Sequence, residues 1–216
     1  MKKYIKNRQN KLRRKRVGNI DIFIKDPIDN FDPCSVIKKT TELIPQHLLR
    51  YIDTIYIGEF EHLEKRSLNA SYSDGMIFVT NAQNSPADLL DDLVHEVAHS
   101  VEEAHSTQVY SDLTLQREFL LKRRKLYNLL GSEGFDVESY SFDEVEYDTS
   151  FDLFLFQDVT YSFLRNLTSD LFYSPYAATS LREYFANGFE AVFYHKDIDK
   201  ISKISPILLE KIEDLL

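Results

Sequence analysis

Residues 85–104 read SPADLLDDLVHEVAHSVEEA, and they carry the clearest structural signal in the chain. Ser85 is a helix-capping residue, Pro86 suits the first helical position, and Asp88 brings a carboxylate to the positive end of a helix. Apolar residues then recur at helical spacing: Leu89, Leu90, Leu93, Val94, Val97, Ala98 and Val101. The pattern predicts a helix from Pro86 to about residue 104 whose broad apolar stripe packs into the core.

Residues 95–99 of this helix read HEVAH. Because an α-helix turns once in 3.6 residues, His95 and His99 lie one turn apart on one face, where two imidazoles can bind a single cation. A carboxylate at Glu96 can take a proton from a metal-bound water and later return it to the leaving amine. Two imidazoles and a carboxylate suit zinc. The motif predicts a zinc-dependent endopeptidase with His95 and His99 as ligands and Glu96 as general base.

A third protein ligand must complete such a site, and the nearest candidates fit poorly. His105 follows His99 by six residues, which is the spacing of one class of zinc peptidases, but Glu102 stands where that class needs a glycine. That class also needs a methionine after the motif, and Met1 and Met76 both precede it. Glu102 and Glu103 are on the helix itself, alongside the site rather than across from it.

A second predicted helix, from Ser180 to about Tyr194, offers Glu183 and Glu190. These glutamates are seven residues apart and so lie on nearly the same face of the helix. Small or polar residues surround Glu183 on that face, which would let this helix approach another closely. The residues alone leave both glutamates open as ligands.

The HEVAH motif and the later segment REYFANGFEAVF, residues 182–193, together resemble a known group of zinc peptidases. The group is the gluzincins related to the catalytic domain of anthrax lethal factor and to the Pro-Pro endopeptidases. The resemblance covers residues 71–194 by the order of elements and only the two motif segments by identity. It implies a zincin-like fold and assigns the third zinc ligand to Glu183, which leaves Glu190 as a partner for a ligating histidine.

The same resemblance implies a tyrosine seven residues before the third ligand, which hydrogen-bonds the developing oxyanion. That position is Tyr176, and Tyr173 is its nearest competitor. Asn187 departs from the group, because relatives often have a second glutamate there. The expected site therefore consists of Glu96 and Tyr176 as catalytic residues and His95, His99 and Glu183 as ligands of Zn²⁺.

Periodicity elsewhere predicts an α+β fold with a small mixed N-terminal sheet, then the active-site helix, then a mostly helical C-terminal half. The expected strands are Val17–Lys25, Thr54–Glu59 and Ser71–Thr80, the last with a turn or bulge at Asp74-Gly75. Ser71–Thr80 is the best candidate for an edge strand that pairs with substrate. The other expected helices run from Pro33 to about His47, Leu113 to Leu130, Phe151 to about Phe172, and onward from Pro206.

The 216 residues and 43% apolar content favour one folded domain, over residues 17–216. Residues 1–16 carry nine Lys/Arg and no acid, which leaves 17 bases against 35 acids in the remainder. We interpret residues 1–16 as a flexible basic arm. Docking on the acidic body is the favoured role for this arm, and nucleic-acid binding is the second.

No stretch has the composition of a secretory signal or of a membrane span, and Cys34 is the single cysteine. We therefore expect a soluble protein in the cytoplasm, or one otherwise not exported by a cleavable signal; a virion or delivery into a host stays open. The expected partner is a protein or peptide substrate, not a membrane. Two rival hypotheses are a regulatory protease recruited to DNA by residues 1–16, and a non-catalytic zinc-binding interaction protein.

Overall fold

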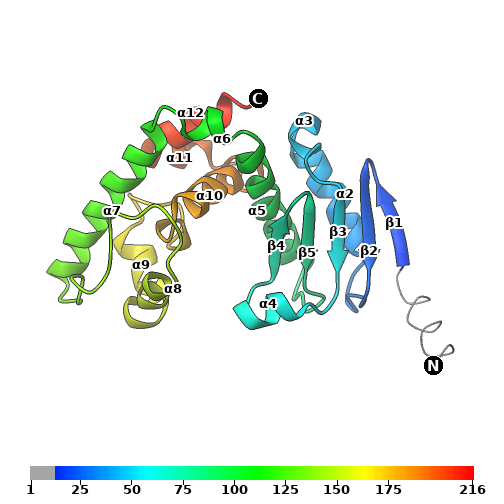
Figure 1. Cartoon of the computed structure of the whole chain (residues 1–216), viewed down its shortest axis with the longest axis horizontal. Helices are drawn as coiled ribbons and strands as arrows, with labels where there is room; N and C mark the ends of the chain where they lie inside the picture. Colours follow the sequence, from blue (N-terminus) through cyan, green and yellow to red (C-terminus); the bar gives the residue numbers. More distant parts are fainter. Residues whose placement is uncertain (1–12) are drawn as a thin grey trace. The chain divides into compact units, whose positions relative to one another are not determined.

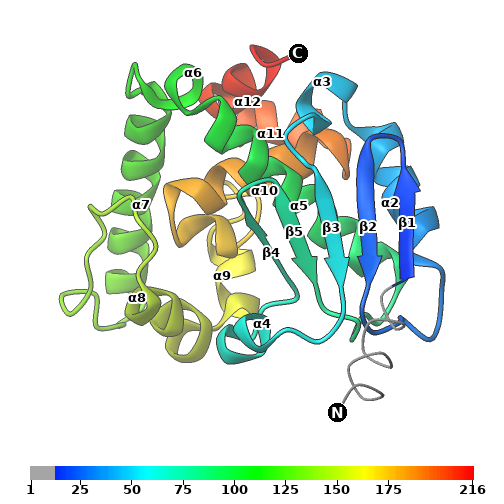
Figure 2. The same cartoon turned by 45° about the vertical axis from the view of Figure 1, so that its right-hand side comes forward.

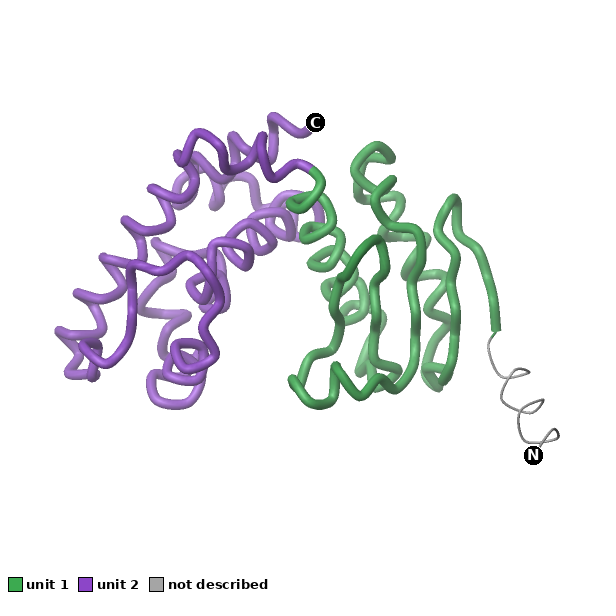
Figure 3. The backbone as a smooth tube through the Cα atoms, in the orientation of Figure 1, with its two compact units in different colours: residues 1–104 green, residues 105–216 purple. Residues whose placement is uncertain are grey.

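The computed structural model describes residues 13–216, and the chain divides into two compact units, residues 1–104 and 105–216 (Figure 3). The first unit contains a small mixed sheet with helices, and the described part of the second is helical (Figure 1). This is the predicted α+β composition. One domain over residues 17–216 stays a prediction, because two compact units can be lobes of one domain. No helix within residues 13–216 is long and apolar enough to cross a membrane.

Five strands form the sheet of the first unit, in the order β1-β2-β3-β5-β4. β2 pairs in parallel with β3, and β3 pairs in parallel with β5, while the outer pairs β1–β2 and β4–β5 are antiparallel. The strands are β1 (Arg13–Val17), β2 (Ile20–Ile24), β3 (Thr54–Ile57), β4 (Ala70–Ser73) and β5 (Met76–Val79). The predicted mixed sheet is therefore confirmed, with two more strands than expected.

The first extra strand corrects the boundary of the basic arm. Arg13–Val17 pair with β2 through a hairpin whose turn contains Gly18 at φ +59°, a conformation that glycine adopts at little cost. A row of charged side chains is typical of an edge strand. Such a row lacks the alternation of apolar and polar residues by which a strand is recognised in a sequence. The predicted arm thus loses residues 13–16 to the sheet, and residues 1–12 lie outside the described residues.

The second extra strand arises inside the predicted strand Ser71–Thr80. Asp74 and Gly75 both have positive φ, at +48° and +78°, as a two-residue hairpin turn requires. The segment is therefore a hairpin of β4 and β5 rather than one strand with a bulge. Because β5 lies between β3 and β4, only β4 presents an edge at this side of the sheet.

The two longer helices of the first unit, α2 (Pro33–Leu43) and α5 (Pro86–Ala104), lie behind the sheet in Figure 2. The buried residues on that face include Ile22, Ile55 and Ile77, one from each central strand. Asp32 caps α2 by accepting a hydrogen bond from the Cys34 amide at 3.3 Å. α2 ends earlier than predicted, before Pro45, and short α3 (Gln46–Leu49) and α4 (Glu61–Arg66) complete the unit.

The second unit contains α6 (Ser106–Tyr110), α7 (Thr114–Ser132), α10 (Leu181–Phe193), α11 (Ile198–Ile204) and α12 (Pro206–Glu213). Three of these confirm predicted helices: α7, α10 and α12. The predicted helix from Phe151 to Phe172 is instead divided into α8 (Thr149–Leu153), a π-helix (Phe154–Thr160) and α9 (Tyr161–Leu167). Thr160 has φ +72° and accepts a hydrogen bond from the Phe163 amide, so it restarts the helix at that point.

α10 and α12 approach each other closely at Gly188. A Cβ built on Gly188 would lie 2.4 Å from Cδ2 of Leu208, a side chain that is only 1% exposed. α10 is buried along most of its length. Gly188 is therefore required for contact between the helices rather than for backbone freedom.

Substituting Gly188→Ala is expected to lower the free energy of unfolding by about 1–3 kcal/mol, because the new methyl group overpacks the contact with Leu208. Urea unfolding followed by circular dichroism measures the change. Gly131→Ala is the matched control, since it lies in α7 and its Cβ would meet its nearest neighbour at 3.6 Å. Gly131→Ala should be neutral or stabilising by up to about 1 kcal/mol, and an equal loss in both variants would contradict the packing argument.

Candidate metal centre

Helix α5 holds the HEVAH motif, and its start is built as the sequence predicts. The Ser85 hydroxyl accepts a hydrogen bond from the Asp88 amide at 3.2 Å, and Pro86 occupies the first helical position. The predicted apolar stripe is buried throughout. A capped helix anchored along its length cannot rotate about its axis, so the direction of the motif's side chains is determined by the core.

His95 and His99 are brought together on one face of α5. Their Nε2 atoms are 3.2 Å apart, and the two rings meet edge to face with centroids 4.8 Å apart. Two imidazole nitrogens bound to one tetrahedral zinc at the usual bond length would be about 3.3 Å apart. The pair therefore fits the spacing that a shared metal ion demands.

The second nitrogen of His99 faces a carboxylate. Oε2 of Glu102 lies 3.4 Å from His99 Nδ1, and both side chains are buried. A carboxylate at Nδ1 favours the proton on that nitrogen, which leaves Nε2 with a lone pair for a metal. Glu102 thus positions His99. The i, i+3 spacing of these residues could have revealed this role, whereas sequence analysis considered Glu102 only as a ligand.

Glu96 is 7% exposed and stands within a negatively charged stretch of α5. Burial raises the pKa of nearby Asp92 to about 6, although a hydrogen bond of 2.9 Å from Gln83 opposes the shift. The negative charges of Asp91 and Glu96 contribute to the raised pKa of Asp92, and His95 opposes it. Such surroundings favour a cation on this face of the helix.

Glu183 belongs to the second unit, in the first turn of α10. Its amide donates to the Ser180 hydroxyl at 3.2 Å, so the capping residue determines where the helix begins and where Glu183 is placed. Asn187 donates to the Glu183 carbonyl at 3.0 Å and accepts a hydrogen bond from Ser174. Asn187 therefore links the segment before α10 to the helix through Ser174.

The two candidate tyrosines have different surroundings in the second unit. Tyr176 begins the short 3₁₀-helix Tyr176–Ala178, and its ring centroid lies 6.4 Å from that of Tyr161. Tyr173 lies between Lys200, whose Nζ is 4.6 Å from the ring centroid, and His195, whose ring centroid is 5.6 Å away. The two rings therefore have different neighbours, which are another aromatic ring for Tyr176 and a cation and an imidazole for Tyr173.

The remaining candidates are placed as follows. Glu190 is buried near the end of α10, where its carbonyl accepts hydrogen bonds from the Tyr194 and His195 amides at 2.9 Å each. His105 stands at the start of α6, beyond the end of α5, and is partly exposed. The described residues include histidine, glutamate and aspartate groups that could hold a metal ion, His95, His99 and Glu183 among them.

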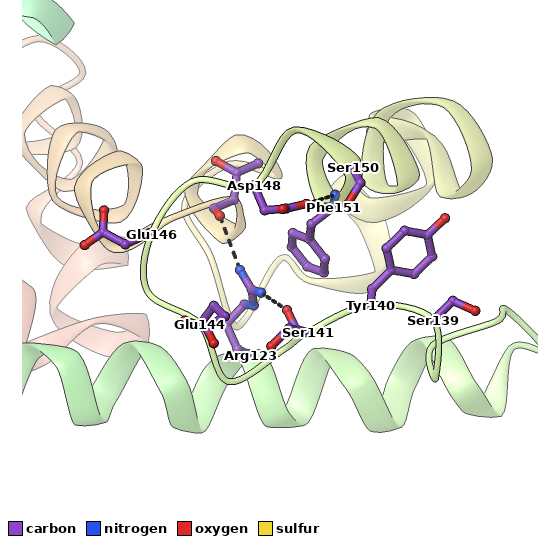
Figure 4. Close-up of a pocket in the computed structure, with 10 residues that line it drawn as sticks. Arg123, Ser139, Tyr140, Ser141, Glu144, Glu146, Asp148, Ser150 and Phe151 are labelled. Carbon is purple, nitrogen blue, oxygen red and sulfur yellow. Dashed lines mark hydrogen bonds between the residues drawn. The ribbon is translucent and has the colours of Figure 1, made fainter.

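The second unit also has a cavity of about 110 Å³ that sequence analysis did not foresee (Figure 4). Arg123, 1% exposed, lies with its guanidinium 3.8 Å from the centroid of the Phe151 ring. Its terminal nitrogens donate to the carbonyls of Ala178 at 2.8 Å and Ser141 at 2.6 Å. These bonds tie the acidic loop after α7 to the segment before α10, so Arg123 has a structural role there. Burial lowers its pKa to about 10.

Comparison with known proteins gave no relatives: no family model, no curated protein and no solved structure matches this chain. The resemblance to gluzincins therefore stays a prediction carried by the two motif segments.

Replacing Glu102 by glutamine is expected to weaken zinc binding by about 10- to 100-fold, because the carboxylate that holds the Nδ1 proton of His99 is lost. Competition with a fluorescent chelator measures the affinity. Glu103→Gln, one residue further along α5 and exposed, is the matched control and should leave the affinity unchanged. An affinity as high in Glu102→Gln as in the wild type would show that Glu102 does not position His99.

Proposed function

We propose that this chain is a zinc-dependent endopeptidase with a zincin-like fold, in which His95, His99 and Glu183 hold the metal. The observation that supports this best is the separation of 3.2 Å between the Nε2 atoms of His95 and His99 on one helix. That separation matches two nitrogens of a tetrahedral zinc site, about 3.3 Å apart. Glu96 is the residue that a purely structural site would not need.

Glu183 is the proposed third ligand. Three protein ligands with one position left open are the mark of a catalytic zinc site, and two histidines with one glutamate are a known set. The resemblance assigns this role to the glutamate of the Glu183–Ala186 segment. Two observations show how the backbone at Glu183 is held: the Ser180 cap sets where α10 starts, and the Asn187 contacts hold the preceding segment to this helix.

When bound, zinc polarises the scissile carbonyl and acidifies a water molecule in its open position. Glu96 accepts the proton of the attacking water and then donates it to the nitrogen of the leaving amine. Tyr176 donates a hydrogen bond to the oxygen of the carbonyl as negative charge develops there. Glu102 holds the tautomer of His99 in which Nε2 is available.

An extended peptide is the proposed substrate. β4 (Ala70–Ser73) is the edge of the sheet nearest in sequence to α5, and an edge strand offers unpaired amides and carbonyls to a peptide backbone. This refines the prediction for Ser71–Thr80, because β5 is internal to the sheet. A protein or peptide as the substrate, and a location in the cytoplasm or one otherwise not reached through a cleavable signal, stay predictions.

Peptidase activity tests the proposal directly. The zinc-loaded chain, incubated with a mixture of peptides of random sequence, is expected to cleave a subset that mass spectrometry identifies. Glu96→Gln should keep the fold and the zinc and lower the cleavage rate by at least about 100-fold, because the general base is lost. The exposed neighbour Glu103→Gln is the matched control and should cleave like the wild type.

Two results would reject the endopeptidase. One is a zinc-loaded wild type that cleaves no peptide, which would favour a non-catalytic zinc-binding protein. The other is cleavage that persists unchanged in Glu96→Gln, which would point to a contaminating protease.

A further inference from the structure

Large apolar side chains are exposed around the π-helix Phe154–Thr160 of the second unit. Among residues 13–216, four of the eight exposed side chains of this kind fall within residues 147–163: Tyr147, Leu153, Phe156 and Phe163. Phe156 is 57% exposed although it belongs to the π-helix, a rare element that is found mostly at functional sites. Such a concentration of exposed apolar groups marks an interaction surface.

Three aromatic side chains of this region are joined into one patch through a carboxylate. The hydroxyls of Tyr147 and Tyr161 both donate to Asp152, at 2.6 Å each. The Tyr161 ring meets the Phe156 ring edge to face, with centroids 5.4 Å apart. Tyr161 is partly exposed, and Tyr147 is 42% exposed. Tyr147, Phe156 and Tyr161 are called the aromatic patch below.

The loop that carries Tyr147 is held on both sides of this residue. Before it, the Val145 carbonyl accepts a hydrogen bond from the Leu181 amide at 2.8 Å. After it, Asp148 caps α8 by accepting a hydrogen bond from the Phe151 amide at 2.7 Å. A surface that is fixed before binding loses less conformational entropy when a partner binds. The aromatic patch is therefore preorganised.

The part of the chain that forms the aromatic patch is strongly acidic. Residues 126–164 contain nine Asp/Glu and no Lys/Arg. Eight of these nine acids are exposed: Glu133, Asp136, Glu138, Asp143, Glu144, Glu146, Asp148 and Asp158. Among residues 13–216, only Asp143 of the nine has a cation within 4.0 Å, which is Arg124. Glu146 also points away from the buried Arg123 in Figure 4. The negative charge next to the aromatic patch is therefore not neutralised by this part of the chain.

We propose that the aromatic patch and the carboxylates of residues 126–164 bind a basic polypeptide segment that carries at least one large apolar side chain. Lysine and arginine side chains of the partner pair with the exposed carboxylates, which supplies complementary charge. Its apolar side chain packs on the Phe156 ring, which removes apolar surface from water. Arginine can also lie over the exposed tyrosine rings.

Other occupants fit this surface less well. A nucleic acid or an anionic membrane would be repelled by the carboxylates. An uncharged apolar partner would cover carboxylates without pairing them, which is costly. A second copy of this chain is disfavoured by its net charge of −9. The inference depends neither on zinc nor on peptidase activity, so each can fail without the other.

The test is fluorescence anisotropy with the full-length Glu96→Gln chain, which leaves the probe uncut. The probe is a labelled peptide of lysine, glycine and two leucines. It should bind at least about tenfold more tightly than the peptide with glycine in place of both leucines, because leucine burial is lost. A peptide with glutamate in place of lysine should not bind. Adding Phe156→Ala should weaken binding of the probe about tenfold, and Glu146→Gln about two- to fivefold.

Two matched controls lie in the second unit outside residues 126–164. Leu121→Ala removes a side chain that is 59% exposed, and Glu213→Gln removes an exposed carboxylate. Both should bind the probe as the parent chain does, and circular dichroism should show every variant folded. The proposal is overturned if the probe does not bind, if the leucines add nothing to affinity, or if Phe156→Ala binds like Leu121→Ala. Self-association of the chain that Phe156→Ala abolishes in sedimentation would assign the patch to a second copy, and would also overturn it.

Discussion

The spacing of two imidazoles on one helix is the constraint on which the proposed centre depends. An α-helix places residues four apart about one turn from each other, and in α5 this brings the Nε2 atoms of His95 and His99 to 3.2 Å. The spacing is held both by features far from the imidazoles and by one carboxylate in contact with them. Ser85 sets the start of the helix, the buried apolar stripe prevents its rotation, and Glu102 faces the Nδ1 of His99. The geometry of the two imidazoles is thus a consequence of how α5 is packed.

In the second unit, the residues proposed for the chemistry lie on or beside segments that are held rigidly. α10 is buried along most of its length, and Gly188 lets it contact α12 closely. Two polar residues, Asn187 and Arg123, fasten the chain that precedes α10, the first through Ser174 and the second through the carbonyl of Ala178. Glu183 and Tyr176 both lie within or next to these anchored segments. Side chains that must meet a metal or an oxyanion benefit from such rigid support.

Helices and motif could be predicted from the sequence because their signals are local. Residues 85–104 contain the cap at Ser85, the apolar periodicity of α5 and the HEVAH motif. Strand β1 escaped prediction because its side chains are charged, and its pairing with β2 becomes visible only in the sheet. The stacking of the Phe23, Tyr56 and Phe78 rings is likewise nonlocal, since these residues come from three separate strands. The sequence around Arg123 does not indicate that its side chain is buried, because its hydrogen-bond partners are backbone carbonyls between 18 and 56 residues away.

The measurement that tests the central claim most directly is the zinc content per folded chain, by elemental mass spectrometry, for the wild type, Glu183→Gln and Glu103→Gln. The account predicts about one zinc in the wild type and in Glu103→Gln, and a clear loss in Glu183→Gln, because Glu183 is the proposed third ligand and Glu103 is exposed. The two substitutions make the same chemical change, and circular dichroism should show both variants folded. A folded wild type without zinc, or full retention of zinc in Glu183→Gln, would contradict the account.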